Sequence, residues 1–112
     1  MIWKAGMISG EQIQQAVERL VAAANPSKVI LFGSYARGDA TEDSDLDLMV
    51  IERDVQNAGE EMIRLHKAVG DVGIGVDVLV YSDKEASRRS QVPGTLLYWA
   101  FREGKVLYDA RP

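Results

Sequence analysis

The sequence predicts an α+β domain (α/β-like in its alternation) with a small mixed β-sheet and helices packed on it, and three observations support this class. Apolar runs rich in strand formers alternate with helical patterns along all 112 residues. Apolar residues make up 46% of the chain and charged residues 27%, an ordinary globular balance. The length suits one domain, residues 1–112, and no repeat, low-complexity segment or linker divides it.

The chain begins with a predicted helix over about residues 9–24, where apolar residues recur at helical spacing. Ser9 and Gln12 fit a capping box at its start, and Asn25 with the proline after it ends it. The apolar run Lys28–Phe32 then predicts a short strand buried on both faces.

The middle of the chain alternates helix and strand. A short helix is expected near residues 35–38, and a strand over 45–51. An amphipathic helix over about 58–69 follows and ends at Gly70, and a third strand covers 76–81. These elements complete most of the predicted order α-β-α-β-α-β-α.

The last part of the chain contains a polar helical turn over Asp83–Arg89 and a break at a Pro-Gly pair. A final helix is expected over about 95–103, with a short extra strand near 106–108. That helix carries Tyr98, Trp99 and Phe101, three large rings that cannot all face the core. We therefore expect one of them, Trp99, to be exposed and available to a partner.

Composition excludes several classes of function. The chain has no cysteine, which excludes disulfides, thiolate metal sites and cysteine catalysis, and its one histidine, His66, argues against zinc. A formal net charge of −4 argues against general nucleic-acid binding. The chain shows no secretion signal and no apolar run long enough for a membrane span, so a cytoplasmic location is expected.

Asp45 and Asp47 are the first candidate functional residues. Aspartate is a poor strand former, yet both stand in the predicted strand 45–51, separated by a leucine. Residues i and i+2 of a strand share one face, with Cα atoms roughly 6.6 Å apart, so the two carboxylates can converge on one cation or an adjacent pair. The alternative is a solvated strand edge, which is also the reading preferred for the loop acids Asp39, Glu42 and Asp43.

Asp77 repeats this pattern on the third strand, between two valines. If the two strands lie close together in the sheet, Asp77 can face the same cation as the other two aspartates. Three carboxylates without a histidine form a hard oxygen site suited to Mg²⁺ or Mn²⁺.

Gly33 and Ser34 follow the buried first strand and precede the predicted short helix. Glycine lets a phosphate approach the backbone, a helix N-terminus offers N–H donors to an anion, and the Ser34 hydroxyl adds one more. A phosphate cradle placed before an acidic metal site indicates phosphoryl chemistry.

The spacing of these residues resembles that of a known family. Gly33-Ser34, ten residues, and then Asp45-x-Asp47 is similar to the signature of the DNA polymerase β-like nucleotidyltransferase superfamily. Within it, the segment 33–48 closely resembles the minimal nucleotidyltransferase (MNT) branch, in which an Arg-Gly pair and a Ser-Asp-x-Asp-Leu run are typical. The matching positions outside the signature are Arg37, Gly38, Ser44, Leu48, a later acid at Asp77, and the closing segment 102–108.

The resemblance implies a metal-dependent transfer of AMP from ATP to a hydroxyl acceptor. By position, Asp45 and Asp47 would bind two divalent metals, Mg²⁺ most simply. Asp77 would be a third ligand or the base for the acceptor hydroxyl. Gly33 and Ser34 would hold the β- and γ-phosphates, and Arg37 would contact phosphate or fix the loop by pairing with a nearby aspartate.

In this branch the acceptor is commonly a tyrosine of an all-helical HEPN toxin, which AMPylation silences, so the resemblance implies an antitoxin. Two alternatives stay open. The chain could neutralise its partner by contact alone, or it could transfer nucleotides to a small molecule or an RNA end. A homo-oligomer is compatible with the sequence.

Overall fold

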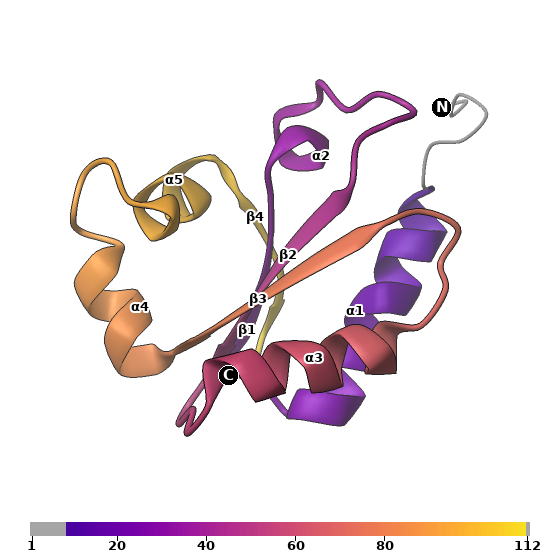
Figure 1. Ribbon diagram of the computed structural model, residues 1–112. Coiled ribbons are helices and arrows are strands. Elements are labelled where there is room, and N and C mark those ends of the chain that lie inside the picture. Colours follow the sequence, from indigo (N-terminus) through magenta and orange to yellow (C-terminus); the bar gives the residue numbers. More distant parts are fainter. Residues whose placement is uncertain (1–8, 112) are drawn as a thin grey trace.

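The computed structural model describes residues 9–111, which form a four-stranded mixed sheet with helices on both of its faces (Figure 1). The predicted α+β class is therefore confirmed. In chain order the elements are α1 (Gly10–Ala24), β1 (Lys28–Phe32), α2 (Ser34–Arg37), β2 (Leu46–Glu52), α3 (Ala58–Val69), β3 (Val76–Ser82), α4 (Asp83–Arg89), α5 (Leu96–Glu103) and β4 (Lys105–Asp109). None of the helices in this range is long and apolar enough to cross a membrane.

The strand order in the sheet is β3-β2-β1-β4. Strand β1 runs antiparallel to both of its neighbours, while β2 and β3 are parallel and are joined by the crossover helix α3. A parallel pair needs such a crossover, because its strands start at the same end of the sheet. The sheet therefore brings the starts of β2 and β3, and the turn after β1, to one edge.

The two faces of the sheet are covered differently. Helices α1 and α3 lie on one face and pack on a large core, whereas α4 and α5 lie on the other face over a smaller one (Figure 1). The sheet residues of the larger core include Val29, Leu31, Leu46, Leu48, Val50, Val76, Val78 and Val80. Those of the smaller core are Ile30, Phe32, Met49 and Ile51.

Local signals in the sequence set most element boundaries. The capping box is confirmed, since the Ser9 hydroxyl accepts a hydrogen bond from the Gln12 N–H at 3.2 Å and the Gln12 side chain accepts one from the Ser9 N–H at 2.8 Å. Asn25 ends α1 in the left-handed conformation, with φ of 46°. One boundary that differs from prediction bears on the candidate site: β2 begins at Leu46, so Asp45 lies just before the strand rather than in it.

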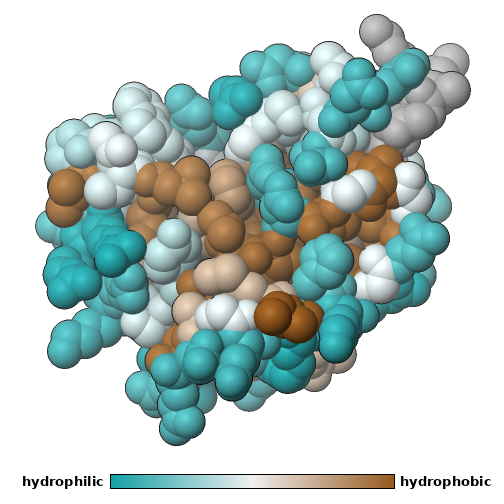
Figure 2. All heavy atoms as spheres, in the orientation of Figure 1, coloured by the Kyte–Doolittle hydropathy of each residue, from teal (hydrophilic) through white to brown (hydrophobic). Residues whose placement is uncertain are grey.

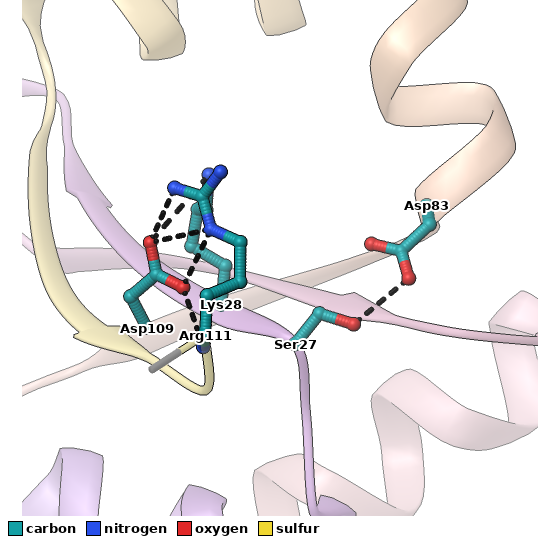
Figure 3. A network of polar contacts seen from close by, with 5 residues as sticks. All are labelled: Ser27, Lys28, Asp83, Asp109 and Arg111. Atoms are coloured by element: carbon teal, nitrogen blue, oxygen red, sulfur yellow. Dashed lines mark hydrogen bonds and ion pairs between the residues drawn. The ribbon is translucent and has the colours of Figure 1, made fainter.

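The predicted extra strand near 106–108 is longer, and as β4 it pairs antiparallel to β1 with a register shift between Val29 and Ile30. Polar contacts fix the end of this pairing (Figure 3). Asp109 accepts hydrogen bonds from Arg111 and lies 4.0 Å from the Lys28 ammonium. The Ser27 hydroxyl donates to Asp83 at 2.8 Å, which ties the start of β1 to the start of α4.

A carboxyl pair joins the end of β2 to α3. The pKa of Glu52 is raised to about 7, first by burial and then by Glu61, while hydrogen bonds from Arg64 lower the pKa of Glu61 to about 2. The buried Oε2 of Glu52 has no partner as a carboxylate, because two carboxylates bond only when one carries a proton. Glu52 is thus best accommodated in its protonated form, donating to Glu61.

This pair predicts a loss of stability with rising pH. The folded pKa of Glu52 lies above its ordinary value of 4.5, so the folded state holds the proton more tightly and stability falls as the pH rises from about 4.5 through about 7. Glu52→Gln mimics the protonated form. At pH 8 it should stabilise the fold by about 1–2 kcal/mol, allowing for partial exposure, and near pH 4 it should change little. Urea unfolding at the two pH values measures this.

The exposed neighbour Glu60, changed to Gln, is the matched control and should leave the pH dependence of unfolding unaltered. An equal effect of Glu52→Gln at both pH values would contradict the assignment of the proton to Glu52.

Candidate active site

Two of the predicted aspartates lie directly opposite each other in the sheet. The register of the parallel pair places Asp47 of β2 beside Asp77 of β3. Because side chains alternate along a strand, and the flanking leucines and valines fill the core under α1 and α3, both carboxylates lie on the face of α4 and α5. Asp47 is half-buried there, and Asp77 is exposed.

Asp45 precedes β2 at the same edge. The Leu46 N–H donates to the Gly75 carbonyl at 2.9 Å, so the chain before β2 runs close to the chain before β3. A Cβ atom at Gly75 would overlap Oδ1 of Asp45, so any side chain there would require the Asp45 carboxylate to move. Asp45 remains exposed, and its charge acts on Asp47.

The electrostatics of the site centre on Asp47. Burial raises its pKa to about 6, helped by the charge and hydrogen bonding of Asp77 and by the charge of Asp45, and opposed by Arg37. Within residues 9–111, no three His, Cys, Asp or Glu side chains already have the geometry of a metal site. The protein thus brings Asp47 and Asp77 together, with Asp45 close enough to influence them.

The turn after β1 fits against Asp47. Gly33 has φ of 75°, a conformation that side chains rarely adopt, and a Cβ atom there would overlap Oδ2 of Asp47. Glycine is therefore needed at this position both for the backbone conformation and for the approach of the carboxylate. The register agrees, since Phe32, the residue before Gly33, pairs with Asp47.

Helix α2 departs from the predicted cradle in one respect. It contains only four residues, and the N–H groups of Ala36 and Arg37 both donate to the Gly33 carbonyl at 3.1 Å. Those two donors are therefore engaged within the turn. The part of the turn that can receive a phosphate is the segment at Gly33 and Ser34.

Arg37 pairs with a nearby aspartate, as one of its two expected roles requires. Its Nε donates to Asp39 at 3.2 Å, and the side chains are 47% and 62% exposed, so the pair holds the loop only weakly. Its positive charge also lowers the pKa of Asp47. An exposed guanidinium beside a carboxylate cluster can exchange Asp39 for a phosphate at small cost.

A cavity of about 310 Å³ joins these residues to α5. One wall comes from the motif and comprises Phe32, Gly33, Ser34, Arg37 and Asp47. The opposite wall comes from α5 and comprises Leu96, Trp99, Ala100 and Glu103. The predicted exposure of Trp99 is confirmed at 50%, but sequence reasoning assigned it to a partner and missed its place beside the motif.

A second cavity of about 290 Å³ lies between α3 and the edge strand β3. Met62, Val76 and Val78 line it, His66 and Lys67 stand among its polar residues, and Ile63 is 60% exposed. Figure 2 shows hydrophobic atoms gathered in a band across the middle of the face that carries β3 and α3 in Figure 1. Asp77 also borders this groove, which therefore reaches the edge where the carboxylates lie.

Solved structures share this fold. A crystal structure of a candidate nucleotidyltransferase from Sulfolobus solfataricus matches with a TM-score of 0.52 and 19% identity, over 96% of this chain and 94% of that one. A crystal structure described as a toxin–antitoxin with AMP-PNP matches with a TM-score of 0.56 and 20% identity, over 88% of this chain and 74% of that chain.

Sequence comparisons agree with these matches. Two proteins of Methanocaldococcus jannaschii, both named as candidate protein adenylyltransferases, are 35% identical over 89 residues and 36% identical over 87 residues. Each match covers 72% of this chain, but 57% of the first relative and 77% of the second. Residues 11–92 match the nucleotidyltransferase domain family, and they contain Gly33, Ser34 and all three aspartates. On this evidence the chain belongs to the nucleotidyltransferase domain family.

Proposed function

We propose that this chain transfers AMP from ATP to a hydroxyl acceptor on a partner protein, a tyrosine of a HEPN-domain toxin, and so acts as an antitoxin. One observation carries the proposal: the Gly33 turn and the Asp47–Asp77 pair meet at one edge of the sheet. The arrangement combines a place for phosphates with a set of carboxylates, which are the two parts that phosphoryl transfer requires.

The donor set fits a hard divalent cation. Asp45, Asp47 and Asp77 offer only oxygen atoms, which Mg²⁺ prefers, and burial together with their mutual repulsion raises the pKa of Asp47. A bound cation would relieve that repulsion, and when bound it would neutralise the phosphates and stabilise charge during displacement. We assign Asp45 and Asp47 as its ligands, and Asp77 as either a third ligand or the base for the acceptor hydroxyl.

The chain's own groups would then carry the transfer. Gly33 and Ser34 hold the β- and γ-phosphates, and Arg37 adds a positive charge beside them. The acceptor oxygen bonds to the α-phosphorus while the bond from that phosphorus to the β-phosphate oxygen breaks, and pyrophosphate leaves. The hydroxyl proton passes to a carboxylate. Asp77 is our candidate, because it is exposed beside the groove from which an acceptor would approach.

Three observations favour a protein as the acceptor. The relatives are named as candidate protein adenylyltransferases, and one structural neighbour is described as a toxin–antitoxin with AMP-PNP. In addition, the groove between α3 and β3 is lined mainly by apolar side chains and reaches Asp77. An exposed apolar groove is more typical of a protein contact than of a small polar acceptor.

A transfer assay tests the proposal directly. The chain is mixed with Mg²⁺, ATP labelled at the α-phosphate, and either a cell lysate or a co-expressed HEPN protein. We expect one labelled protein band, with label on tyrosine. The Asp45→Ala, Asp47→Ala double variant should abolish it, because both metal ligands are lost.

The matched control is the Glu42→Ala, Asp43→Ala double variant, which removes the same charge from the neighbouring exposed loop and should keep full activity. Label on RNA would indicate a tailing enzyme. Absence of label from a partner that still binds would indicate neutralisation by contact alone.

Gly33→Ala tests the phosphate turn. A Cβ atom there would overlap Oδ2 of Asp47 and sit at a positive φ, so we expect at least a tenfold loss of transfer together with about 1–3 kcal/mol of lost stability. Gly10→Ala is the control, since a Cβ at Gly10 meets nothing within 4 Å. Steady-state kinetics and urea unfolding measure the two effects, and full transfer by Gly33→Ala would refute this role.

Asp47→Asn tests whether the negative charge of the Asp47 carboxylate destabilises the fold without metal and binds Mg²⁺. The folded pKa of Asp47, about 6, exceeds its ordinary value of 3.8, so its ionisation costs stability as the pH rises through this range. In EDTA at pH 8 the variant should melt at a higher temperature than the unmodified chain. Mg²⁺ should raise the melting temperature of the unmodified chain but not that of Asp47→Asn.

Asp43→Asn serves as the control for a lost loop charge and should respond to Mg²⁺ like the unmodified chain. An equal Mg²⁺ response from Asp47→Asn would rule out Asp47 as a ligand.

A further inference from the structure

The α5 wall of the 310 Å³ cavity has its own regular pattern. Leu96, Trp99 and Glu103 are spaced three and four residues apart, so they share one face of the helix. Leu97 and Ala100 are 1% and 2% exposed and pack on the smaller core, with Ala100 also bordering the cavity beside Leu96. The helix is thus anchored on one side and presents an apolar and aromatic strip to the motif on the other.

Trp99 is half-exposed and contacts the ring of its neighbour Tyr98. Its ring makes a T-shaped contact with Tyr98, with centroids 5.3 Å apart and planes at 89°, and the Arg102 guanidinium lies 4.4 Å from the Tyr98 centroid. The helix itself is capped by Thr95, whose hydroxyl accepts from the Tyr98 N–H at 3.1 Å. A half-exposed indole beside the motif can stack with another flat ring.

The size and chemistry of the cavity indicate what it would hold. A volume of about 310 Å³ lies at the low end for small-molecule sites, which suits a nucleoside better than a whole nucleoside triphosphate. Its motif wall, at Gly33 and Ser34, is where the phosphates are assigned. Its far wall offers an indole for stacking and the Glu103 carboxylate, which can accept hydrogen bonds from hydroxyl or amino groups.

We propose that Trp99 and Leu96 form the nucleoside pocket of the donor, with the base stacked on the Trp99 indole and the phosphates running to the Gly33 turn. This inference rests on the proposed placement of the phosphates at Gly33 and Ser34. It assigns to α5, which lies outside the 33–48 motif and beyond the matched segment 11–92, the recognition of the base.

Fluorescence tests the pocket separately from the chemistry. The chain contains two tryptophans, so a Trp3→Phe variant leaves Trp99 as the only indole. This variant is titrated with Mg²⁺ and α,β-methylene-ATP, which cannot release pyrophosphate, and in parallel with Mg²⁺ and inorganic tripolyphosphate, which has no base. Calorimetry measures binding of both. We expect the nucleotide to quench Trp99 and tripolyphosphate to bind without doing so.

Variants complete the test. In the unmodified background, Trp99→Ala should weaken nucleotide binding roughly 5- to 150-fold, the range expected for one lost base stack, and leave tripolyphosphate binding unchanged. Trp99→Tyr should restore most of the affinity. Phe101→Ala is the matched control, an aromatic of the same helix that is 39% exposed and does not line the cavity, and it should bind the nucleotide normally.

The outcomes separate the two assignments. The nucleoside pocket is overturned if the nucleotide binds without changing Trp99 emission. It is also overturned if Trp99→Ala weakens the binding of the nucleotide and of tripolyphosphate equally. If Trp99→Ala also no longer binds the partner protein, Trp99 is a protein contact instead. If the nucleotide quenches Trp99 but tripolyphosphate does not bind, the nucleoside pocket is supported and the placement of the phosphates at Gly33 and Ser34 is wrong. Failure of both ligands to bind overturns both assignments.

Discussion

The register between β2 and β3 is the constraint on which the rest of the site depends. Side chains alternate along a strand, so a slip of one residue would turn Asp47 into the core and Leu48 out of it. The larger core prevents this slip, because Leu46, Leu48 and the valines of β3 are buried under α1 and α3. Hydrophobic packing on one face of the sheet therefore fixes the position of the carboxylates on the other.

The same register makes the site electrostatically unfavourable on its own. Asp47 stands beside Asp77 in the ladder, and burial and the neighbouring charges move its pKa to about 6. Such a conflict between local chemistry and the fold is typical of functional sites. Apart from the Glu52–Glu61 pair, the remainder of residues 9–111 is locally consistent, with side-chain caps on α1, α3, α4 and α5 and two separate apolar cores.

Sequence patterns alone predicted the elements and the fold class, because periodicity and caps are local properties. They also identified Gly33 and Asp47, which the structure brings into contact range, and Asp77, which it pairs with Asp47. They did not predict the strand order, the antiparallel pairing of β1, or the bulge against β4, since these depend on contacts between distant segments. The sequence predicts Asp45 inside a strand because the alternation of aspartate and leucine begins at residue 45. The hydrogen-bonded strand β2 begins one residue later, at Leu46.

The role of α5 shows why the cavity could not be derived from the motif. Leu97 and Ala100 belong to the buried stripe of α5. The prediction that Trp99 lies outside this stripe is confirmed. Which surface that ring faces depends on how α5 crosses β1, a long-range packing choice. Because α5 packs on the face that carries Asp47, and not on the face covered by α1 and α3, its exposed stripe is directed at the motif. An exposed Trp99 therefore needs no partner protein to account for it, since the fold already places it beside Gly33, Ser34 and Asp47, where we propose that the donor nucleotide binds.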